Sequence, residues 1–477
     1  MILSDFPLMV PGASPAGKLE VRSPFDGAVI AFVETADAKV TERALQIAYS
    51  LYRDRSNWLS IPKRLAVLEG TAAKMVEQAE PQALLIAREG GKPLTDARVE
   101  VARAIDSVKL CIETLRTQKG DMIPMNLNPA SEGRLAFTQH EPIGVVLAFS
   151  AFNHPLNLIV HQVGPAIASG CPVIIKPAEA TPLSCLNFVR FLRDSGLPDE
   201  WCQAVVVDDL DVAARMVADS RLGFFSFIGS AKVGWMLRSK LAPGVRCALE
   251  HGGAAPVIVE PDADLDNALP LLAKGGFYHA GQVCVSVQRI FAHVSIAREL
   301  AEGLADAARE MIVGDPSQTE TEVGPLIRQA KLSRVHDWVV EAVNSGGELL
   351  CGGEAVSDSC YACTVLFNPP VNASVSNQEI FGPVICVYPY VSLNEAIARA
   401  NGLDYAFQAA LFTTNINTAL AVSRQLDAAA IMVNDHTAFR VDWMPFAGHK
   451  QSGLGTGGIS YTIRDMQAEK LIVLRSG

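Results

Sequence analysis

Short apolar runs rich in β-branched residues alternate with helical patterns from Ile143 onward, and this alternation constrains the fold more than any other feature. Strands separated by helices form βαβ units, which build parallel sheets. The first strands are expected at Gly144–Phe149, Pro172–Ile175, Ala204–Val207 and Phe224–Ile228. The chain therefore predicts an α/β fold.

A second series of strand patterns begins after Glu250. Its strands are expected at Pro256–Val259, Arg289–Val294 and Val384–Tyr388. A helix is expected at Ile296–Ile312, and residues 40–115 also show the three- and four-residue apolar intervals of amphipathic helices. For 477 residues, at roughly 100–200 per domain, this order predicts two α/β domains joined near residue 250.

Two segments lie outside this alternation. Residues 121–138 lack a helical period and are expected to form an arm of extended strands. The C-terminal Glu469-Lys-Leu-Ile-Val-Leu is a strand pattern with no partner nearby in the sequence.

Composition excludes several classes of protein. Hydrophobic residues make up 49% and charged residues 19%, which favours large buried cores over disorder. The formal net charge of -11 argues against a nucleic-acid partner, which needs a basic face. Polar residues interrupt the longest apolar stretch, 142–160, which argues against a membrane span. The first residues do not resemble a signal peptide, and the ten cysteines are expected as free thiols in the cytoplasm.

Two motifs match only by their letters. Cys360-Tyr-Ala-Cys363 is a CxxC with no second Cys or His pair at a suitable spacing, so no metal site is predicted. Residues 453–458 fit GxGxxG, but no strand pattern precedes them and no βαβ unit follows. A flexible turn is expected there rather than a phosphate site.

Two strand ends are candidates for binding a nucleotide. Gly229-Ser230 joins a strand to a helix, where free backbone N–H groups suit a pyrophosphate, although such a junction is also common as a tight turn. Lys176 and Glu179 follow another strand, at the edge where open α/β sheets bind ligands. They are placed either to bind ribose hydroxyls or to form a solvated charge pair. A carboxylate there would repel a 2′-phosphate and favour NAD over NADP.

Cys284, in Gly281-Gln-Val-Cys284, is the candidate nucleophile. Glu250 precedes two glycines and could supply a separate carboxylate base, as acyl chemistry through a thioester requires. The Asn153 amide could donate to an oxyanion, or it could cap a helix that begins with proline. Spacing alone does not bring these three residues together.

In their order along the chain, these motifs resemble the aldehyde dehydrogenase superfamily. The matching segments are Glu141-Pro-Ile-Gly-Val, Phe152-Asn153, Lys176-Pro-Ala-Glu179, Gly229-Ser230, Leu249-Glu250-His-Gly-Gly, Gly281-Gln-Val-Cys284, Glu379-Ile-Phe381-Gly-Pro and Pro445-Phe-Ala-Gly-His-Lys-Gln-Ser-Gly. Departures from the usual family pattern are Phe152 in place of Trp, His251 in place of Leu and Ala447 in place of Gly.

The resemblance implies a role for each matching residue. Cys284 would be the nucleophile, Glu250 the general base, and the Asn153 amide with the Cys284 backbone N–H the oxyanion hole. NAD would be the cofactor, with NADP as the alternative. The residues implied in binding it are Ser150, Phe152, Lys176, Glu179, Gly229, Ser230, Glu379 and Phe381. Because relatives that transfer the acyl group to coenzyme A generally lack the glutamate, Glu250 favours release of a carboxylic acid.

The resemblance also implies an architecture. It comprises a Rossmann-type NAD-binding domain (1–120 and 139–249), an α/β catalytic domain (250–434) and a strand arm (121–138 and 456–477) that pairs subunits. Homodimers or homotetramers are expected.

The segment Asn434-Asp-His-Thr-Ala-Phe-Arg440-Val-Asp-Trp-Met-Pro is similar to a branch acting on small polar aldehydes, which includes lactaldehyde and phosphonoacetaldehyde dehydrogenases. Arg103 and His154 could clamp an anionic group, or Arg103 could be a surface charge on its helix. Val283 adds no charge beside the nucleophile. Phosphonoacetaldehyde-like and lactaldehyde-like substrates therefore both stay open. Alternatives are a semialdehyde such as succinic semialdehyde and a non-catalytic binding protein on the same fold.

Overall fold

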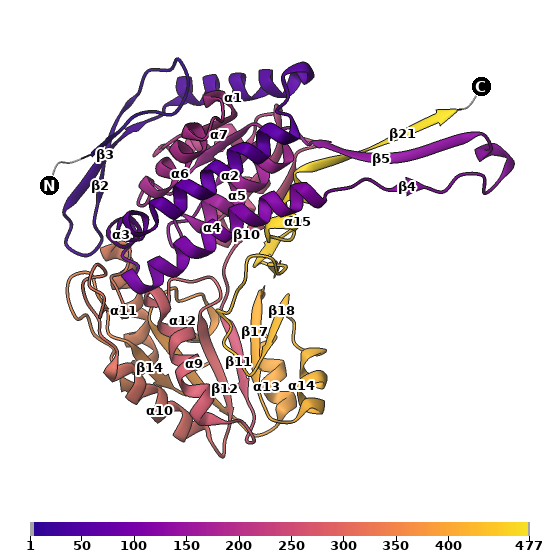
Figure 1. Cartoon of the computed structure of the whole chain (residues 1–477). Coiled ribbons are helices and arrows are strands. Elements are labelled where there is room, and N and C mark those ends of the chain that lie inside the picture. The colour runs from indigo at the N-terminus through magenta and orange to yellow at the C-terminus, as the bar shows by residue number, and fades with distance from the viewer. Residues whose placement is uncertain (1–3, 476–477) are drawn as a thin grey trace.

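The computed structural model of the chain describes residues 4–475. Two α/β lobes lie one above the other, and a long arm of strands extends to one side (Figure 1). Residues 1–3 and 476–477, the outer ends of the expected NAD-binding domain and arm, lie outside the described residues.

The first lobe contains a six-stranded sheet that is parallel except for one edge strand. In spatial order its strands are β20 (Gly453–Leu454), β10 (Arg246–Glu250), β9 (Leu222–Ile228), β6 (Val145–Phe149), β7 (Val173–Lys176) and β8 (Cys202–Ala204). All residues of β6 and β7 are buried, as expected of strands covered by helices on both faces.

Helices of the first lobe cover this sheet on both sides (Figure 1). They are α1 (Ala38–Arg53), α2 (Ile61–Glu77), α3 (Ala79–Gly90), α4 (Leu94–Thr117), α5 (Asn157–Ser169), α6 (Leu183–Asp194), α7 (Leu210–Val217) and α8 (Ala231–Arg238). Helix α5 packs against α4 and is buried along its whole length, so it carries apolar residues on every side. A three-stranded sheet of β1 (Ser4–Phe6), β3 (Val29–Thr35) and β2 (Gly17–Arg22) precedes these helices.

The second lobe is built on a seven-stranded sheet that is parallel except where β13 pairs with β14. The strand order is β13 (Glu348–Cys351), β14 (Thr364–Phe367), β15 (Val384–Tyr390), β12 (Val287–His293), β11 (Ala255–Val259), β17 (Gln408–Phe412) and β18 (Ala430–Val433). Its helices are α9 (Leu265–Phe277), α10 (Ala297–Glu310), α11 (Gln329–Asn344), α12 (Ser374–Asn377), α13 (Leu393–Ala400) and α14 (Ile416–Ser423).

The arm is a three-stranded antiparallel sheet in which β5 (Arg134–Pro142) lies between β21 (Gln467–Arg475) and β4 (Met122–Ile123). The C-terminal strand thus finds its partner more than 300 positions earlier in the chain, with Leu471 opposite Thr138. Residues 456–466, which the expected arm included, instead contain α15 (Ile459–Asp465), and this helix packs against α4 and α5 of the first lobe.

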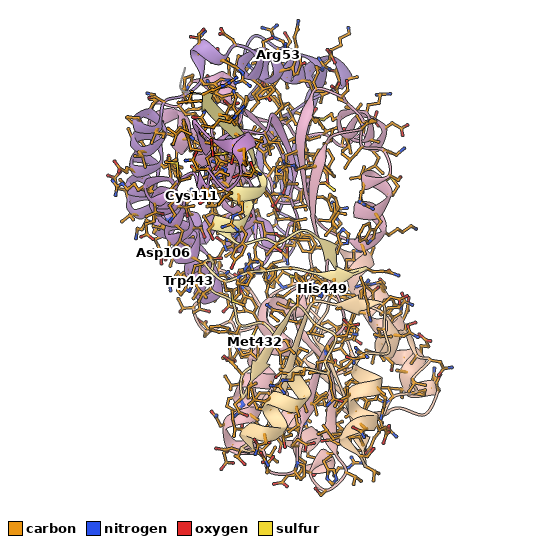
Figure 2. All side chains as sticks on the ribbon, turned by 90° about the vertical axis from the view of Figure 1, so that its right-hand side faces the viewer. Arg53, Asp106, Cys111, Met432, Trp443 and His449 are labelled. Carbon is orange, nitrogen blue, oxygen red and sulfur yellow. The ribbon has the colours of Figure 1, made fainter. Side chains whose placement is uncertain are left out.

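The chain returns from the second lobe to the first between β18 and β20. Figure 2 shows Trp443 and His449 on this returning segment, at the level where the two lobes meet. Beside it, β16 (Tyr405–Ala406) pairs with β19 (His449–Lys450).

The structure confirms the predicted α/β fold and corrects two local predictions. The strand expected at Ala204–Val207 ends at Ala204, because β8 covers Cys202–Ala204. Residues 453–458 are not a flexible turn: Gly453 and Leu454 pair with β10, and Gly458 caps α15. A Cβ atom on Gly457 would lie 2.2 Å from Oε1 of Glu250, so these glycines allow close packing.

Two buried carboxylates cap the helices that follow β6 and β7. Glu89 accepts hydrogen bonds from the N–H groups of Leu183 and Ser184 at the start of α6. Glu100 does the same for the N–H groups of Leu156 and Asn157 at the start of α5. Each carboxylate satisfies N–H donors that a helix leaves free in its first turn, and so fixes the loop before that helix.

Across residues 4–475, no helix combines the length and the apolar character needed to cross a lipid bilayer.

Candidate active site

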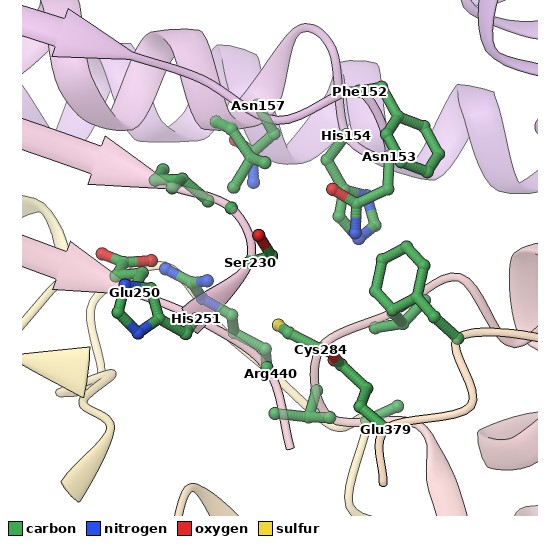
Figure 3. Close-up of a pocket in the computed structure, with 18 of the residues that line it drawn as sticks. Phe152, Asn153, His154, Asn157, Ser230, Glu250, His251, Cys284, Glu379 and Arg440 are labelled. Atoms are coloured by element: carbon green, nitrogen blue, oxygen red, sulfur yellow. The ribbon is translucent and has the colours of Figure 1, made fainter. Parts of the chain in front are cut away.

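One pocket between the two lobes collects side chains from both of them (Figure 3). The first lobe contributes the loops after β6, β9 and β10, and the second lobe contributes the turn before β12. The carboxyl ends of neighbouring parallel strands share one edge of a sheet, which is why Asn153, Ser230 and Glu250 meet there. The pocket joins these residues to Cys284.

Cys284 follows a backbone segment in an uncommon conformation. His279, Ala280 and Gly281 have φ angles of 50°, 54° and 67°, in the left-handed region. A Cβ atom on Gly281 would lie 2.0 Å from the carbonyl oxygen of Gly382, so only glycine fits at this position. Such strain persists only where the surrounding structure holds it, and it is common at functional sites.

The side chain of Gln282 fixes this segment through hydrogen bonds to the backbone. Its amide donates hydrogen bonds to the carbonyls of His279 and Pro325, and its side-chain oxygen accepts one from the N–H of Ile327. Gln282 is 1% exposed. Its own backbone carbonyl accepts a hydrogen bond of 2.8 Å from Nδ2 of Asn153.

This contact orients the Asn153 amide. A primary amide has two N–H donors, so one remains after the bond to Gln282. Figure 3 shows Asn153 beside His154, with both side chains pointing toward the region of Cys284. Asn153 is 4% exposed and can therefore act as a pre-oriented donor in a site with little water.

Glu250 ends β10 and borders the pocket. Burial raises the pKa of its carboxyl above the usual value, and the positive charge of Arg440 opposes this shift. A carboxylate of raised pKa is a better proton acceptor near neutral pH.

Burial also raises the pKa of the Cys284 thiol, to about 12. Arg440 lowers it, whereas the carboxylates of Glu379 and Glu250 raise it further. The thiol is therefore protonated at neutral pH in this arrangement, and Arg440 is the nearby charge that favours the reactive thiolate.

Arg440 was missing from the predicted site residues. Its guanidinium lies over the ring of Phe446, 3.5 Å from the centroid, and its Nη2 is 3.4 Å from Nδ1 of His161. Its Nε is buried and has no hydrogen-bond partner among the described residues. Arg440 lies in the segment 434–445, whose similarity to a branch acting on small polar aldehydes was recognised in the sequence. Periodicity, however, does not show that an arginine near the C-terminus faces Cys284.

Asp442 ties this segment to the first lobe. It accepts two hydrogen bonds from Arg103, at 3.0 and 2.7 Å, and lies 2.8 Å from Nε2 of His161. Arg103 borders the pocket, and its side chain is 27% exposed. Asp442 already compensates much of its positive charge.

His154 also borders the pocket, but it does not supply a positive charge. Burial lowers the pKa of its imidazole to about 4, and the charge of Lys92 acts in the same direction. The two residues expected to clamp an anion are therefore an arginine paired with Asp442 and a neutral histidine.

Residues suited to a nucleotide lie along the same sheet edge. Lys176 forms an ion pair with Glu179 just beyond β7. The Oγ atom of Ser150 is buried without a hydrogen-bond partner among residues 4–475. Ser230 precedes α8 and makes no side-chain capping bond, and Gly229 beside it also borders the pocket.

A second group of expected cofactor residues lies on the other side of Cys284. The rings of Phe152 and Phe381 are 5.9 Å apart, edge to face. Glu379 packs so closely on the backbone that a Cβ atom on Gly252 would lie 1.6 Å from its Oε1. Burial raises the pKa of the Glu379 carboxyl to about 7, and Arg334 and Lys331 lower it.

The chain matches the aldehyde dehydrogenase family over residues 10–472. It is 35% identical to 3-sulfolactaldehyde dehydrogenase of Priestia aryabhattai, over 96% of this chain and 95% of that protein. Its identity to lactaldehyde dehydrogenase of Methanocaldococcus jannaschii is 34%, over 96% and 97% of the two chains.

Among solved structures, aldehyde dehydrogenase 21 of Physcomitrella patens, in complex with the reaction product succinate, superimposes with a TM-score of 0.95. It is 33% identical, over 100% of this chain and 99% of the other. Similar solved proteins include one described as NAD-dependent and one complexed with NADP.

The fold and these matches define an NAD(P)-dependent oxidoreductase. The chain belongs to the aldehyde dehydrogenase family and is an aldehyde-oxidising enzyme, which confirms the resemblance seen in its motifs.

The charge of Arg440 can be tested on the thiol itself. In Arg440→Met, the thiolate of Cys284 loses its stabilising cation, so its pKa rises and alkylation by iodoacetamide at pH 8 slows by about tenfold, as for one pKa unit. The measurement is the rate of modification of the Cys284 peptide by mass spectrometry. Arg298→Met, which removes a surface ion pair with Glu348, is the control and keeps the wild-type rate. An unchanged rate in Arg440→Met contradicts this role.

Proposed function

We propose that the protein oxidises a small polar or anionic aldehyde to its carboxylic acid with NAD, through covalent intermediates on Cys284. The observation that carries the proposal is the gathering of Cys284, Glu250 and Asn153 in one pocket, from three distant parts of the chain. A nucleophile, a separate base and an oxyanion donor are the groups that acyl chemistry through a thioester needs.

In the first step the Cys284 thiol passes its proton to a water molecule, and its sulfur attacks the aldehyde carbon. The product is a thiohemiacetal whose oxygen carries the developing negative charge. The free N–H of Asn153 and the backbone N–H of Cys284 stabilise this oxygen. In comparable sites one such donor contributes about 3–4 kcal/mol to transition-state stabilisation.

Oxidation removes a hydride from the thiohemiacetal carbon and leaves a thioester on Cys284. When bound, the nicotinamide cofactor supplies the hydride acceptor. Glu250 then takes a proton from a water molecule, the resulting hydroxide adds to the thioester carbon, and the carbon–sulfur bond breaks. The carboxylic acid is released, and the departing sulfur takes the proton held by Glu250, which restores both the thiol and the carboxylate.

Glu250→Gln separates the two halves of the reaction. We expect a burst of NADH in the first turnover, because oxidation does not need the carboxylate, followed by a steady rate at least about 100-fold below wild type. Stopped-flow absorbance at 340 nm measures both phases. Glu341→Gln, an exposed carboxylate on α11, serves as the matched control. If Glu250→Gln turns over at the wild-type steady rate, another group is the base.

The described residues fit a dinucleotide. The unpartnered Oγ of Ser150 and the uncapped N-terminus at Ser230 are donors without partners near one sheet edge, as a pyrophosphate requires. Lys176 and Glu179 would hold ribose hydroxyls, and Glu379 with Phe381 would position the second ribose and the ring. The Glu179 carboxylate supports NAD over NADP, because it would repel a 2′-phosphate.

Cofactor choice is tested with Glu179→Gln. Without the carboxylate, Lys176 loses its ion-pair partner and can bind the 2′-phosphate of NADP. We therefore expect kcat/KM for NADP to rise about tenfold, which corresponds to a charge interaction of about 1.4 kcal/mol. Steady-state kinetics with both cofactors give the ratio. The control is Glu77→Gln on the exposed end of α2. A wild-type enzyme that prefers NADP refutes this part of the proposal.

Two arginines that line the pocket support an anionic or strongly polar substrate. The Nε atom of Arg440 makes no hydrogen bond to the described residues and lies 4.0 Å from Asp442, and Arg103 borders the same pocket. Relatives named for 3-sulfolactaldehyde and lactaldehyde agree with this class, and phosphonoacetaldehyde would present a similar anion. Succinic semialdehyde is the alternative, favoured by the succinate in a similar structure.

A panel of lactaldehyde, sulfolactaldehyde, phosphonoacetaldehyde and succinic semialdehyde tests the substrate class. In Arg103→Ala, kcat/KM falls about tenfold or more for the anionic aldehydes and changes little for lactaldehyde, because a charge-assisted hydrogen bond is lost. Arg98→Ala, on the same helix with the exposed partner Glu80, is the control. If kcat/KM of Arg103→Ala equals that of the wild-type enzyme for every aldehyde, Arg103 is not an anion ligand. If the wild-type protein forms no NADH with any aldehyde, a binding function on this fold is favoured instead.

The arm supports assembly into homodimers or homotetramers. Its strands expose apolar side chains, with Leu135, Leu471 and Val473 about half exposed. Exposed apolar side chains gathered on one element mark a contact surface. We therefore propose that β5 and β21 pack against a second copy of the chain.

A further inference from the structure

A buried ion pair lies directly behind the pocket. Lys92, in the turn before α4, contacts Glu100 on that helix, and their side chains are 0% and 1% exposed. Burying two charges costs free energy, so such a pair needs further partners to be tolerated. The structure supplies hydrogen-bond partners from the loop that follows β6 and the start of α5, and the ring of Tyr278 lies 5.8 Å from the Lys92 ammonium.

Glu100 holds the backbone of this loop. One of its oxygens accepts hydrogen bonds of 2.9 and 3.0 Å from the N–H groups of Leu156 and Asn157, and the other contacts Lys92. Asn153 lies three residues before Leu156. The direction of the Asn153 amide therefore depends on Glu100 at one end of the segment and on the bond to Gln282 at the other.

Lys92 holds the side chain of His154, the residue that follows Asn153. Its ammonium contacts Nδ1 of His154, and an ammonium can only donate hydrogen bonds. Nδ1 must then accept, and the proton of a neutral imidazole resides on Nε2. Figure 3 shows the His154 ring beside the Asn153 amide at the pocket. Nε2–H is the part of the ring left free for a ligand.

We propose that Lys92 and Glu100 are positioning residues that fix the Asn153 loop and hold His154 as a neutral Nε2–H donor to the substrate. The donor suits an oxygen near the aldehyde carbon, such as a hydroxyl, carboxylate, sulfonate or phosphonate oxygen. This inference rests on the proposed aldehyde oxidation and extends it to substrate recognition. His154 recognises an oxygen acceptor through a hydrogen bond rather than through a positive charge.

The groups that face His154 come from the turn before α4, from α4 itself and from the nucleophile turn. Lys92 and Arg103 keep the imidazole neutral, and Glu100, 3.6 Å from Nδ1, favours its protonation. The rings of Tyr278 and His279 lie 6.0 and 6.3 Å away. Lys92 is thus the contact that keeps a proton off Nδ1.

Lys92→Met removes the ammonium and keeps the length of the side chain. Nδ1 then faces the Glu100 carboxylate and binds a proton, and the imidazole titrates near its ordinary pKa of about 6.5. Below that pKa the imidazolium keeps Nε2–H, but above it the neutral ring carries its proton on Nδ1 and Nε2 is no longer a donor. We expect KM for the aldehyde at pH 8 to rise about tenfold, KM for NAD to stay unchanged, and a new ionisation between pH 5 and 7 in kcat/KM. Wild-type constants with no new ionisation overturn the proposal.

The double variant Lys92→Met/Glu100→Gln provides the rescue. Its glutamine oxygen can still accept from Leu156 and Asn157, and its amide can donate to Nδ1 of His154. We expect most of the lost kcat/KM to return and the new ionisation to disappear. A double variant no better than Lys92→Met refutes the positioning role. The matched control is Lys274→Met, which breaks the neighbouring pair with Asp96 on the same helix and leaves the pH profile unchanged.

The protonation of His154 can be measured on the wild-type enzyme, independently of any variant that fails to fold and of any aldehyde. Solid-state ¹⁵N spectra of histidine-labelled protein identify His154 by the signal missing in His154→Gln. The neutral Nε2–H form at pH 7 supports the proposal, and an Nδ1–H form or an imidazolium overturns it. A wild-type enzyme without aldehyde oxidation, by contrast, refutes the proposed function and leaves this assignment of the tautomer intact.

Discussion

Parallel strand pairing is the constraint on which the rest of this structure depends. Because β6, β7, β9 and β10 run in one direction, the loops at their carboxyl ends open on a single edge of the sheet. The second sheet presents the turn before β12 to that same edge, and the pocket forms between the two lobes. The nucleophile, the base and the oxyanion donor therefore lie at the end of a strand or on a short loop next to one.

Buried charges then determine how precisely those loops are held. Asp442 joins the returning segment to Arg103 and His161, while Glu100 and Lys92 hold the loop of Asn153. Each charge is costly to bury alone, so each has partners from distant segments. The same contacts set the charge around Cys284: Arg440 favours its thiolate, and Glu250 and Glu379 oppose it.

Much of the fold and part of the site could be predicted, and the failures have physical reasons. Strands such as β7 and β12 are continuous apolar runs, and period and composition suffice to find them. Residues 453–458 were misread because β20 has only two residues and owes its existence to pairing with β10. The roles of Arg440 and Lys92 were not predicted, because they depend on residues more than 50 positions away in the sequence. Arg440 acts on His161 and Cys284, and Lys92 contacts His154.

The sequence by itself determined the alternation of strands and helices, the family, and the residue types offered for catalysis, because local periodicity and ordered motifs carry that information. Only the tertiary structure decided which of them meet. It joined β21 to β5, showed Arg103 to be paired with Asp442, and made His154 a neutral group. Protonation and pairing depend on burial and on charges brought from distant parts of the chain, and no local pattern records either.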